Sequence, residues 1–161
     1  MDTASITIGS ILLLLFIAPV LYVIWKQSLQ DKKLLKKLIE EGARYNLKFD
    51  HTEVSNSLLL GLDSGNKKLL AIEPDNDKTT LVDLVKISDS KILKKVTPNP
   101  SSFKDREKIM QVSIELMENK RGEKVSQILF YDEDARDGTD VGTRLTSALK
   151  WEKLIKANLS I

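Results

Sequence analysis

A run of twenty residues without a charged side chain, from Ile6 to Trp25, most constrains what this chain can become. Thirteen of its positions are Ile, Leu, Val or Phe. As an α-helix the run would be about 30 Å long, which matches the hydrocarbon thickness of a bilayer. At roughly −0.3 to −0.6 kcal/mol for each such residue, the run favours membrane insertion by several kcal/mol. Residues 1–26 are therefore predicted to form a transmembrane anchor.

Two other interpretations of this segment fit its composition less well. A cleavable signal peptide has a basic start, a shorter apolar stretch and a small-residue cleavage site, whereas only Met1–Ser5 precede this run and Tyr22–Trp25 end it. A buried core helix is usually shorter and apolar on one side only. The aromatic rings of Tyr22 and Trp25 also fall where such rings prefer the headgroup region. An uncleaved anchor is the interpretation we favour.

Basic residues follow the apolar run and predict its orientation. No Lys or Arg precedes the run, so the positive-inside bias predicts that the N-terminus lies outside the cell inner membrane and that residues 26–161 are cytoplasmic. The predicted membrane-interface residues are two aromatic anchors and five lysines: Tyr22, Trp25, Lys26, Lys32, Lys33, Lys36 and Lys37. Each lysine close to a membrane surface attracts anionic headgroups by about 1 kcal/mol. A solvated flank that only sets the topology is the simpler interpretation, and we favour it over specific lipid recognition.

Residues 27–45 are predicted to form a juxtamembrane amphipathic helix that connects the anchor to the domain. Its apolar stripe consists of Leu34, Leu35, Leu38 and Ile39. Ser28 followed by Asp31 predicts the start of this helix, and Gly42 predicts its end. We expect the stripe to pack on the following domain. It is too short for a strong coiled-coil signal, and a homo-oligomer stays an alternative.

The remaining residues, 46–161, are enough for one domain. The chain has 25 basic and 23 acidic residues, a net charge of +2, whereas the basic residues of a nucleic-acid-binding domain would dominate and cluster on one face. We therefore expect no nucleic acid among its partners.

Short apolar runs separated by turn residues predict seven β-strands in this domain. The predicted strands are Leu47–Asp50, Ser57–Leu62, Lys67–Ile72, Thr79–Ile87, Lys91–Val96, Lys108–Met117 and Lys124–Tyr131. Asp63–Asn66 and Asn119–Gly122 supply glycine for hairpin turns. Alternation along Met110–Leu116 predicts one buried strand face. Pro98 and Pro100 separate the earlier strands from a final hairpin.

An amphipathic helix is predicted from Asp140 to about Leu159, with Trp151 near the edge of its apolar stripe. The carboxylate of Asp140 can accept hydrogen bonds from the free N–H groups of the first turn. A terminal helix can cover the open end of a curved antiparallel sheet. The expected fold class is therefore α+β.

This order of elements resembles the pleckstrin-homology-like (PH-like) superfold. The resemblance implies a seven-stranded antiparallel β-sandwich or barrel over residues 46–161, closed by a C-terminal helix. Gly61–Leu70 is also similar to the first hairpin of small single-span bacterial membrane proteins with such a cytoplasmic domain. That likeness implies a topology and no activity.

The resemblance also bears on ligands. PH domains that bind phosphoinositides carry basic residues in the loop between their first two strands. The matching loop here, His51–Asn56, contains Glu53 and no Lys or Arg, which argues against inositol-lipid binding at that site. Other members bind peptides or partner domains by strand addition at an exposed sheet edge, or in the groove beside the helix. Fold alone does not choose among these uses.

No residue pattern predicts catalysis, a cofactor or a metal site. His51 is the only histidine, and with no cysteine and no G-x-S-x-G elbow a nucleophilic mechanism lacks support. The acidic stretch Asp132–Asp140 departs from EF-hand spacing, with Thr143 at position 12. A solvated loop ending in a helix cap accounts better for it. Glu73–Asp77 is interpreted as an exposed acidic turn.

Two functions of different classes fit these observations. We favour a membrane-anchored cytoplasmic interaction module, an accessory or scaffold subunit of a larger membrane assembly, whose partners are the lipid bilayer and other membrane proteins. The alternative is a lipid-headgroup or small-ligand sensor at the inner membrane surface. An enzyme would need a polar pocket with perturbed titratable groups, which no sequence feature predicts.

Overall fold

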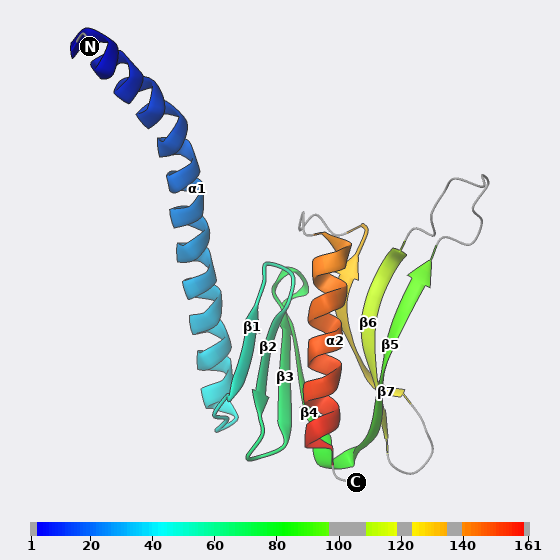
Figure 1. Ribbon diagram of the computed structural model, residues 1–161. Helices are drawn as coiled ribbons and strands as arrows, with labels where there is room; N and C mark the ends of the chain where they lie inside the picture. Colours follow the sequence, from blue (N-terminus) through cyan, green and yellow to red (C-terminus); the bar gives the residue numbers. More distant parts are fainter. Residues whose placement is uncertain (1–2, 97–108, 119–123, 135–139, 160–161) are drawn as a thin grey trace, which may run out of the picture.

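The computed structural model describes residues 3–96, 109–118, 124–134 and 140–159, with the side chains of residues 3–12 and 14 left out of the description. Figure 1 shows the two helices and seven strands of this part of the chain. In chain order they are α1 (Thr3–Arg44), β1 (His51–Val54), β2 (Leu59–Asp63), β3 (Lys68–Glu73), β4 (Lys78–Asp83), β5 (Ile87–Val96), β6 (Ile109–Glu118), β7 (Lys124–Asp132) and α2 (Val141–Asn158). Single turns of 3-10 helix lie at Pro74–Asn76 and Leu84–Lys86.

The strands form two antiparallel sheets, one in the order β1-β2-β3-β4 and the other in the order β5-β6-β7. The expected α+β class with seven antiparallel strands is thus confirmed. Among the described residues the two sheets do not join into a closed barrel. The predicted turn Asn119–Gly122 and the prolines Pro98 and Pro100 lie outside the described residues.

The first helix, α1, is unbroken over its 42 residues. The prediction that a separate helix begins at Ser28 is therefore wrong. From Lys26 to Glu41 the chain contains no Gly and no Pro, so nothing interrupts the backbone hydrogen bonds of the helix. The boundary expected between residues 26 and 27 does not coincide with a helix end.

The end of α1 is set by Asn46 rather than by Gly42. Asn46 adopts a φ of 55°, in the left-handed region that terminates many helices. The N–H groups of Tyr45 and Leu47 both donate to the Gly42 carbonyl oxygen, at 3.0 and 2.9 Å. Gly42 lies inside the last turn, where its small size serves a packing contact.

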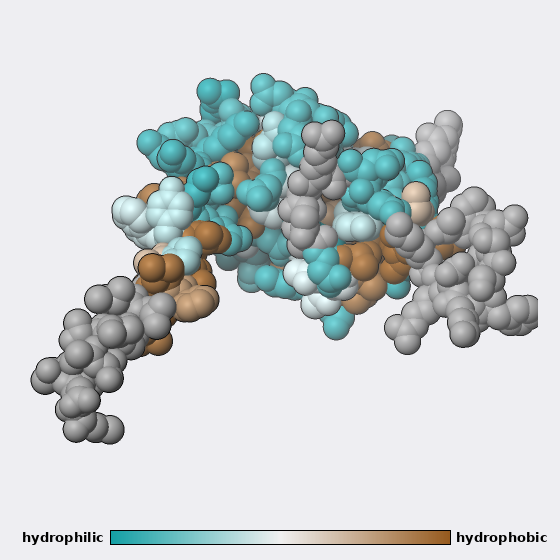
Figure 2. Space-filling view, turned by 90° about the horizontal axis from the view of Figure 1, so that it is seen from above, coloured by the Kyte–Doolittle hydropathy of each residue, from teal (hydrophilic) through white to brown (hydrophobic). Residues whose placement is uncertain are grey.

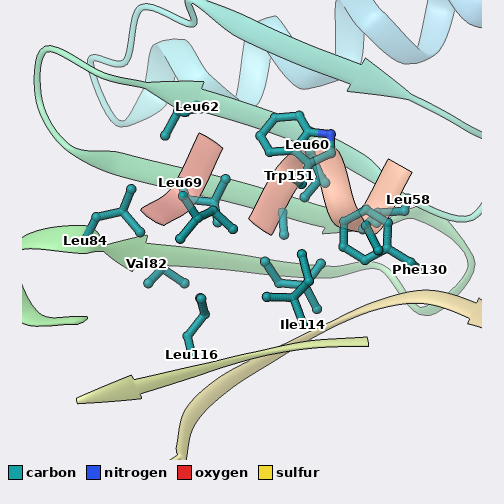
Figure 3. Close-up of a cluster of buried hydrophobic side chains, with 14 of the residues drawn as sticks. Leu58, Leu60, Leu62, Leu69, Val82, Leu84, Ile114, Leu116, Phe130 and Trp151 are labelled. Carbon is teal, nitrogen blue, oxygen red and sulfur yellow. The ribbon is translucent and has the colours of Figure 1, made fainter. Parts of the chain in front are cut away.

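The β1–β4 sheet is covered on both faces. Its inner face packs on the second sheet and on α2, as the close-up in Figure 3 shows for Leu60, Leu69 and Val82 against Ile114, Phe130 and Trp151. Its outer face packs on the C-terminal half of α1 in a second cluster that contains Leu38, Leu47, Leu59, Leu70 and Ile72. Strands buried on both faces are continuously apolar instead of alternating, which explains the leucine-rich sequences of β2 and β3.

The ring of Phe49 lies between α1 and the outer face of the β1–β4 sheet. A Cβ atom at Gly42 of α1 would lie 2.5 Å from this ring, and one at Gly61 of β2 would lie 2.6 Å from it. Only residues without a side chain permit so close an approach on both sides. Phe49 therefore fixes α1 at one position on the sheet.

The first strand differs from the prediction. Leu47–Asp50 was expected to be strand, but Leu47 and Phe49 pack against α1 instead. Strand β1 follows at His51–Val54 and pairs with β2 from His51↔Leu62 to Val54↔Leu59. Most of the loop expected at His51–Asn56 is therefore part of β1. The fourth strand ends at Asp83, earlier than predicted, because a 3-10 turn follows it.

The C-terminal helix is confirmed. Asp140 caps α2, because its carboxylate accepts the N–H groups of Gly142 and Thr143 at 2.9 and 3.2 Å. Trp151 was expected near the edge of the apolar stripe, yet it is only 1% exposed and lies in the core with Ile155. The helix packs against all three strands of the β5–β7 sheet.

Candidate functional site

The N-terminal half of α1 exposes its apolar side chains. Between Leu13 and Leu29 the described large apolar residues of this half are 42–74% exposed. They are Leu13, Leu15, Phe16, Ile17, Val20, Leu21, Tyr22, Val23, Ile24, Trp25 and Leu29. Figure 1 shows this half projecting away from the sheets, and Figure 2 shows hydrophobic surface along it. Exposed apolar patches of this extent are typical of sites that contact a membrane or another protein.

Within the part of the chain whose side chains are described, no helix combines the length and apolarity needed to cross a membrane.

The five predicted interface lysines lie outside the face of α1 that is docked on the β1–β4 sheet, and Lys37 is at the edge of that face. At about 100° per residue they fall within an arc of about 140°, centred roughly opposite the buried Leu38. The structure divides them by their partners. Lys36 Nζ lies 3.6 Å from Glu40 Oε1, and Lys37 Nζ lies 3.4 Å from Asp77 Oδ1. The other three, Lys26, Lys32 and Lys33, are exposed and form no ion pair with any described residue.

A second feature is the seam between β4 and β7, which we call the β4–β7 seam. Each of these strands is the edge of its sheet. One cavity of about 270 Å³ is lined by Thr80–Asp83 on one side and by Val125 and Ser126 on the other. A cavity of about 230 Å³ lies between Lys78 and Gln127, and a small one of about 70 Å³ follows toward Asp132. The two strands therefore run alongside each other in opposite directions, with space between them.

The β4–β7 seam offers unpaired strand edges together with a few side chains. Leu81 and Val125 are 38% and 52% exposed beside it. Gln111 donates from Nε2 to Asp132 Oδ2 at 3.3 Å, while its buried Oε1 accepts from no described residue. An extended segment of another chain can add to such edges by backbone hydrogen bonds.

A polar cluster joins β1 to α2. Glu53 accepts hydrogen bonds from the Trp151 indole N–H at 2.7 Å and from the Ser147 hydroxyl. Next to it, Arg144 donates from Nη2 to Ser57 Oγ at 3.1 Å. Glu53 was expected in a loop comparable to a phosphate-binding loop, but it lies on β1 and holds the helix. An open groove of about 710 Å³ runs beside this cluster.

Asp63 is a buried carboxylate at the end of β2. It accepts the N–H groups of Lys48 and Asn66 and the Asn66 side-chain amide, each at 2.8 Å. Burial raises the pKa of Asp63, but the hydrogen bonds donated by Lys48, Asn66 and Gly65 outweigh it and leave this pKa below its ordinary value. The ionised carboxylate therefore stabilises the hairpin turn and is not available as a proton donor near neutral pH.

The residues considered for chemistry are dispersed in the structure. His51 is exposed at the start of β1. Glu73, in the acidic turn, pairs with Lys78 at 3.3 Å. Of the acidic stretch, Asp132 binds the Gln111 amide and Asp140 caps α2, while residues 135–139 lie outside the description. Among the described residues, no three His, Cys, Asp or Glu side chains are placed to hold a metal ion.

No family model, no curated protein and no solved structure matches this chain. Its function must therefore be argued from the exposed half of α1 and from the β4–β7 seam. The first was indicated by the sequence. The second was not, because it depends on which strands become sheet edges, and no local residue pattern reports that.

Proposed function

We propose that this protein is a non-enzymatic interaction module, anchored in the cell inner membrane by the apolar half of α1 with its β domain in the cytoplasm. The observation that carries the proposal is the exposure of apolar side chains from Leu13 to Leu29 on a helix whose other half is docked on the sheet. Water disfavours such a surface, whereas a bilayer buries it. The apolar sequence from Ile6 to Trp25 has the length that the bilayer requires.

The domain itself is proposed to be PH-like. Four antiparallel strands, then three, then a C-terminal helix support this assignment. In this proposal the domain acts as an accessory or scaffold subunit, and the β4–β7 seam receives an extended segment of a membrane protein partner. Tethering both proteins to one membrane raises their effective concentration, so a short added strand is sufficient.

Cysteine substitution tests the proposed topology, because the chain contains no cysteine. We expect Thr3→Cys to react with a membrane-impermeant maleimide in spheroplasts. Lys150→Cys, at an exposed position of α2, should react only after permeabilisation. The wild-type protein should stay in the membrane pellet after alkaline carbonate extraction. Release into the supernatant, or labelling of Lys150→Cys in sealed spheroplasts, would contradict the proposal.

Leu81→Glu tests the β4–β7 seam as the partner site. A charge beside an added strand should weaken binding at least about tenfold, equivalent to about 1.4 kcal/mol. The measurement is quantitative recovery of cross-linked membrane proteins with the tagged full chain in mild detergent. Leu93→Glu is the matched control, because Leu93 is 42% exposed on β5 and lines none of the seam cavities. The β4–β7 seam would be excluded as the partner site if both variants lost binding equally, or if the wild type recovered no partner in stoichiometric amount.

The small-ligand alternative gains less support from the geometry. The two larger cavities along the β4–β7 seam, about 270 and 230 Å³, are smaller than the 300–1,000 Å³ or so of ordinary ligand pockets. The larger groove beside Glu53 is open to solvent along α2. An extended peptide fits the seam better than a compact ligand does.

A further inference from the structure

We infer that Lys26, Lys32 and Lys33 together form a binding site for the headgroups of anionic phospholipids, from which Lys36 and Lys37 are excluded. This inference rests on the membrane anchoring proposed above and names the lipid that the anchored helix selects. Sequence alone treats the five lysines as equivalent. The structure separates them by their ion pairs and by their distance along α1 from Trp25.

Ion pairing is the first ground. Lys37 reaches across to Asp77 in the turn that follows β3, and Lys36 pairs with Glu40 one turn further along α1. A headgroup phosphate would have to compete with these carboxylates for either lysine. The three proposed residues have no such competitor among the described residues. Their ammonium groups are free to bind an external anion.

Distance from the membrane surface is the second ground. Trp25 at the headgroup level places Lys26 next to the surface and Lys32 and Lys33 about 10–12 Å further along the helix. Lys36 and Lys37 follow at about 16–18 Å. Helical side chains lean toward the N-terminus, here toward the membrane, and long lysine side chains reach the interface in this way. Because the surface potential decays over a Debye length of about 8 Å, the nearer lysines gain most of the attraction.

The direction of the lysines is the third ground. The docked face of α1 is centred near Leu38, and the lysines lie on the opposite side, where the β domain does not block approach. Asp31 is the only acidic residue between Trp25 and Glu40. At about 100° per residue it falls on the docked side of the helix, away from Lys33. Between Lys26 and Lys33 the lysine side therefore carries only positive charge.

Fluorescence quenching in vesicles tests the inference with the full chain. The protein has two tryptophans, and Trp151 is buried in the core, so quenching by brominated lipids reports on Trp25. Vesicles of phosphatidylcholine would contain either brominated phosphatidylglycerol or brominated phosphatidylcholine at the same mole fraction. We expect the brominated anionic lipid to quench Trp25 at least about twofold more strongly, because the lysines enrich it around the helix.

Two variants identify the residues responsible. The triple variant Lys26→Gln, Lys32→Gln, Lys33→Gln should quench equally with both brominated lipids. The matched double variant Lys36→Gln, Lys37→Gln should keep the wild-type preference. Equal quenching of the wild type by both lipids, or loss of the preference in the double variant, would overturn this inference while leaving the anchor intact. Absence of quenching by either lipid would instead refute the membrane anchoring itself.

Discussion

Replacing Trp151 with alanine is expected to lower the free energy of unfolding by about 3–5 kcal/mol, the usual cost of removing a large aromatic side chain from a core. Trp151 projects from α2 into the core, where it is 1% exposed and packs with residues of both sheets. Its indole N–H also satisfies Glu53, so the truncation leaves both a cavity and a carboxylate with one donor fewer. Far-UV circular dichroism during urea unfolding of the full chain in mild detergent measures the effect.

The variant Trp151→Phe separates packing from hydrogen bonding at this position. Phenylalanine fills most of the space but cannot donate to Glu53, and a loss of about 1–3 kcal/mol is expected because Oε2 of Glu53 loses the indole donor. Glu53→Gln keeps an acceptor for the indole and should cost less than either Trp151 variant. Equal stability of the alanine and phenylalanine variants would show that Trp151 does not act through its bulk.

Asp63→Ala is expected to cost about 2–4 kcal/mol near neutral pH, because it removes a buried charged acceptor that holds the backbone N–H groups of Lys48 and Asn66. The loss should appear as a lower urea midpoint with an unchanged slope. Asp63→Asn is the matched control. It keeps the size of the side chain but turns an amide N–H₂ toward N–H groups, so it should recover little of the stability.

The contribution of Asp63 should also depend on pH. Because its folded-state pKa is lowered, the stabilisation is complete above the ordinary carboxyl pKa and is lost as the pH falls through the folded-state value. The stability difference between wild type and Asp63→Ala should therefore shrink when the pH is lowered from about 7 to about 3. A difference that stays constant over this range would show that the pKa of Asp63 is not lowered in the folded protein.

Local sequence patterns correctly predicted those features of the fold that depend on residues close together in the chain. Alternation along β6 and the cap at Asp140 gave the right strand face and the right helix start, because both depend on adjacent residues. Continuous apolar sequence in β2 and β3 also indicated strands. Its cause, burial on both faces, became clear only when α1 was seen on the outer face.

Non-local contacts explain what the sequence did not reveal. Phe49 was assigned to a strand, yet it packs between two glycines that are distant from each other along the chain. Lys37 was grouped with the other lysines because its ion pair joins residues forty positions apart. The break expected at Ser28 followed a capping pattern that the uninterrupted helix does not use. The first two outcomes depend on tertiary packing, whereas the third reflects a stretch without Gly or Pro that lets the helix continue.

One proline gives α1 a defined place to bend. Pro19 has no N–H to donate to the carbonyl of Leu15, so curvature of the helix is easiest there. Beyond it, Trp25–Arg44 contains no proline and is locked to the sheet by Phe49, so this half of the helix and the β domain turn as one body. A bend of about 10° at Pro19 would displace Arg44, roughly 38 Å away along the helix, by about 6–7 Å. A small bend at Pro19 would thus carry the whole β domain sideways relative to the N-terminal half of α1.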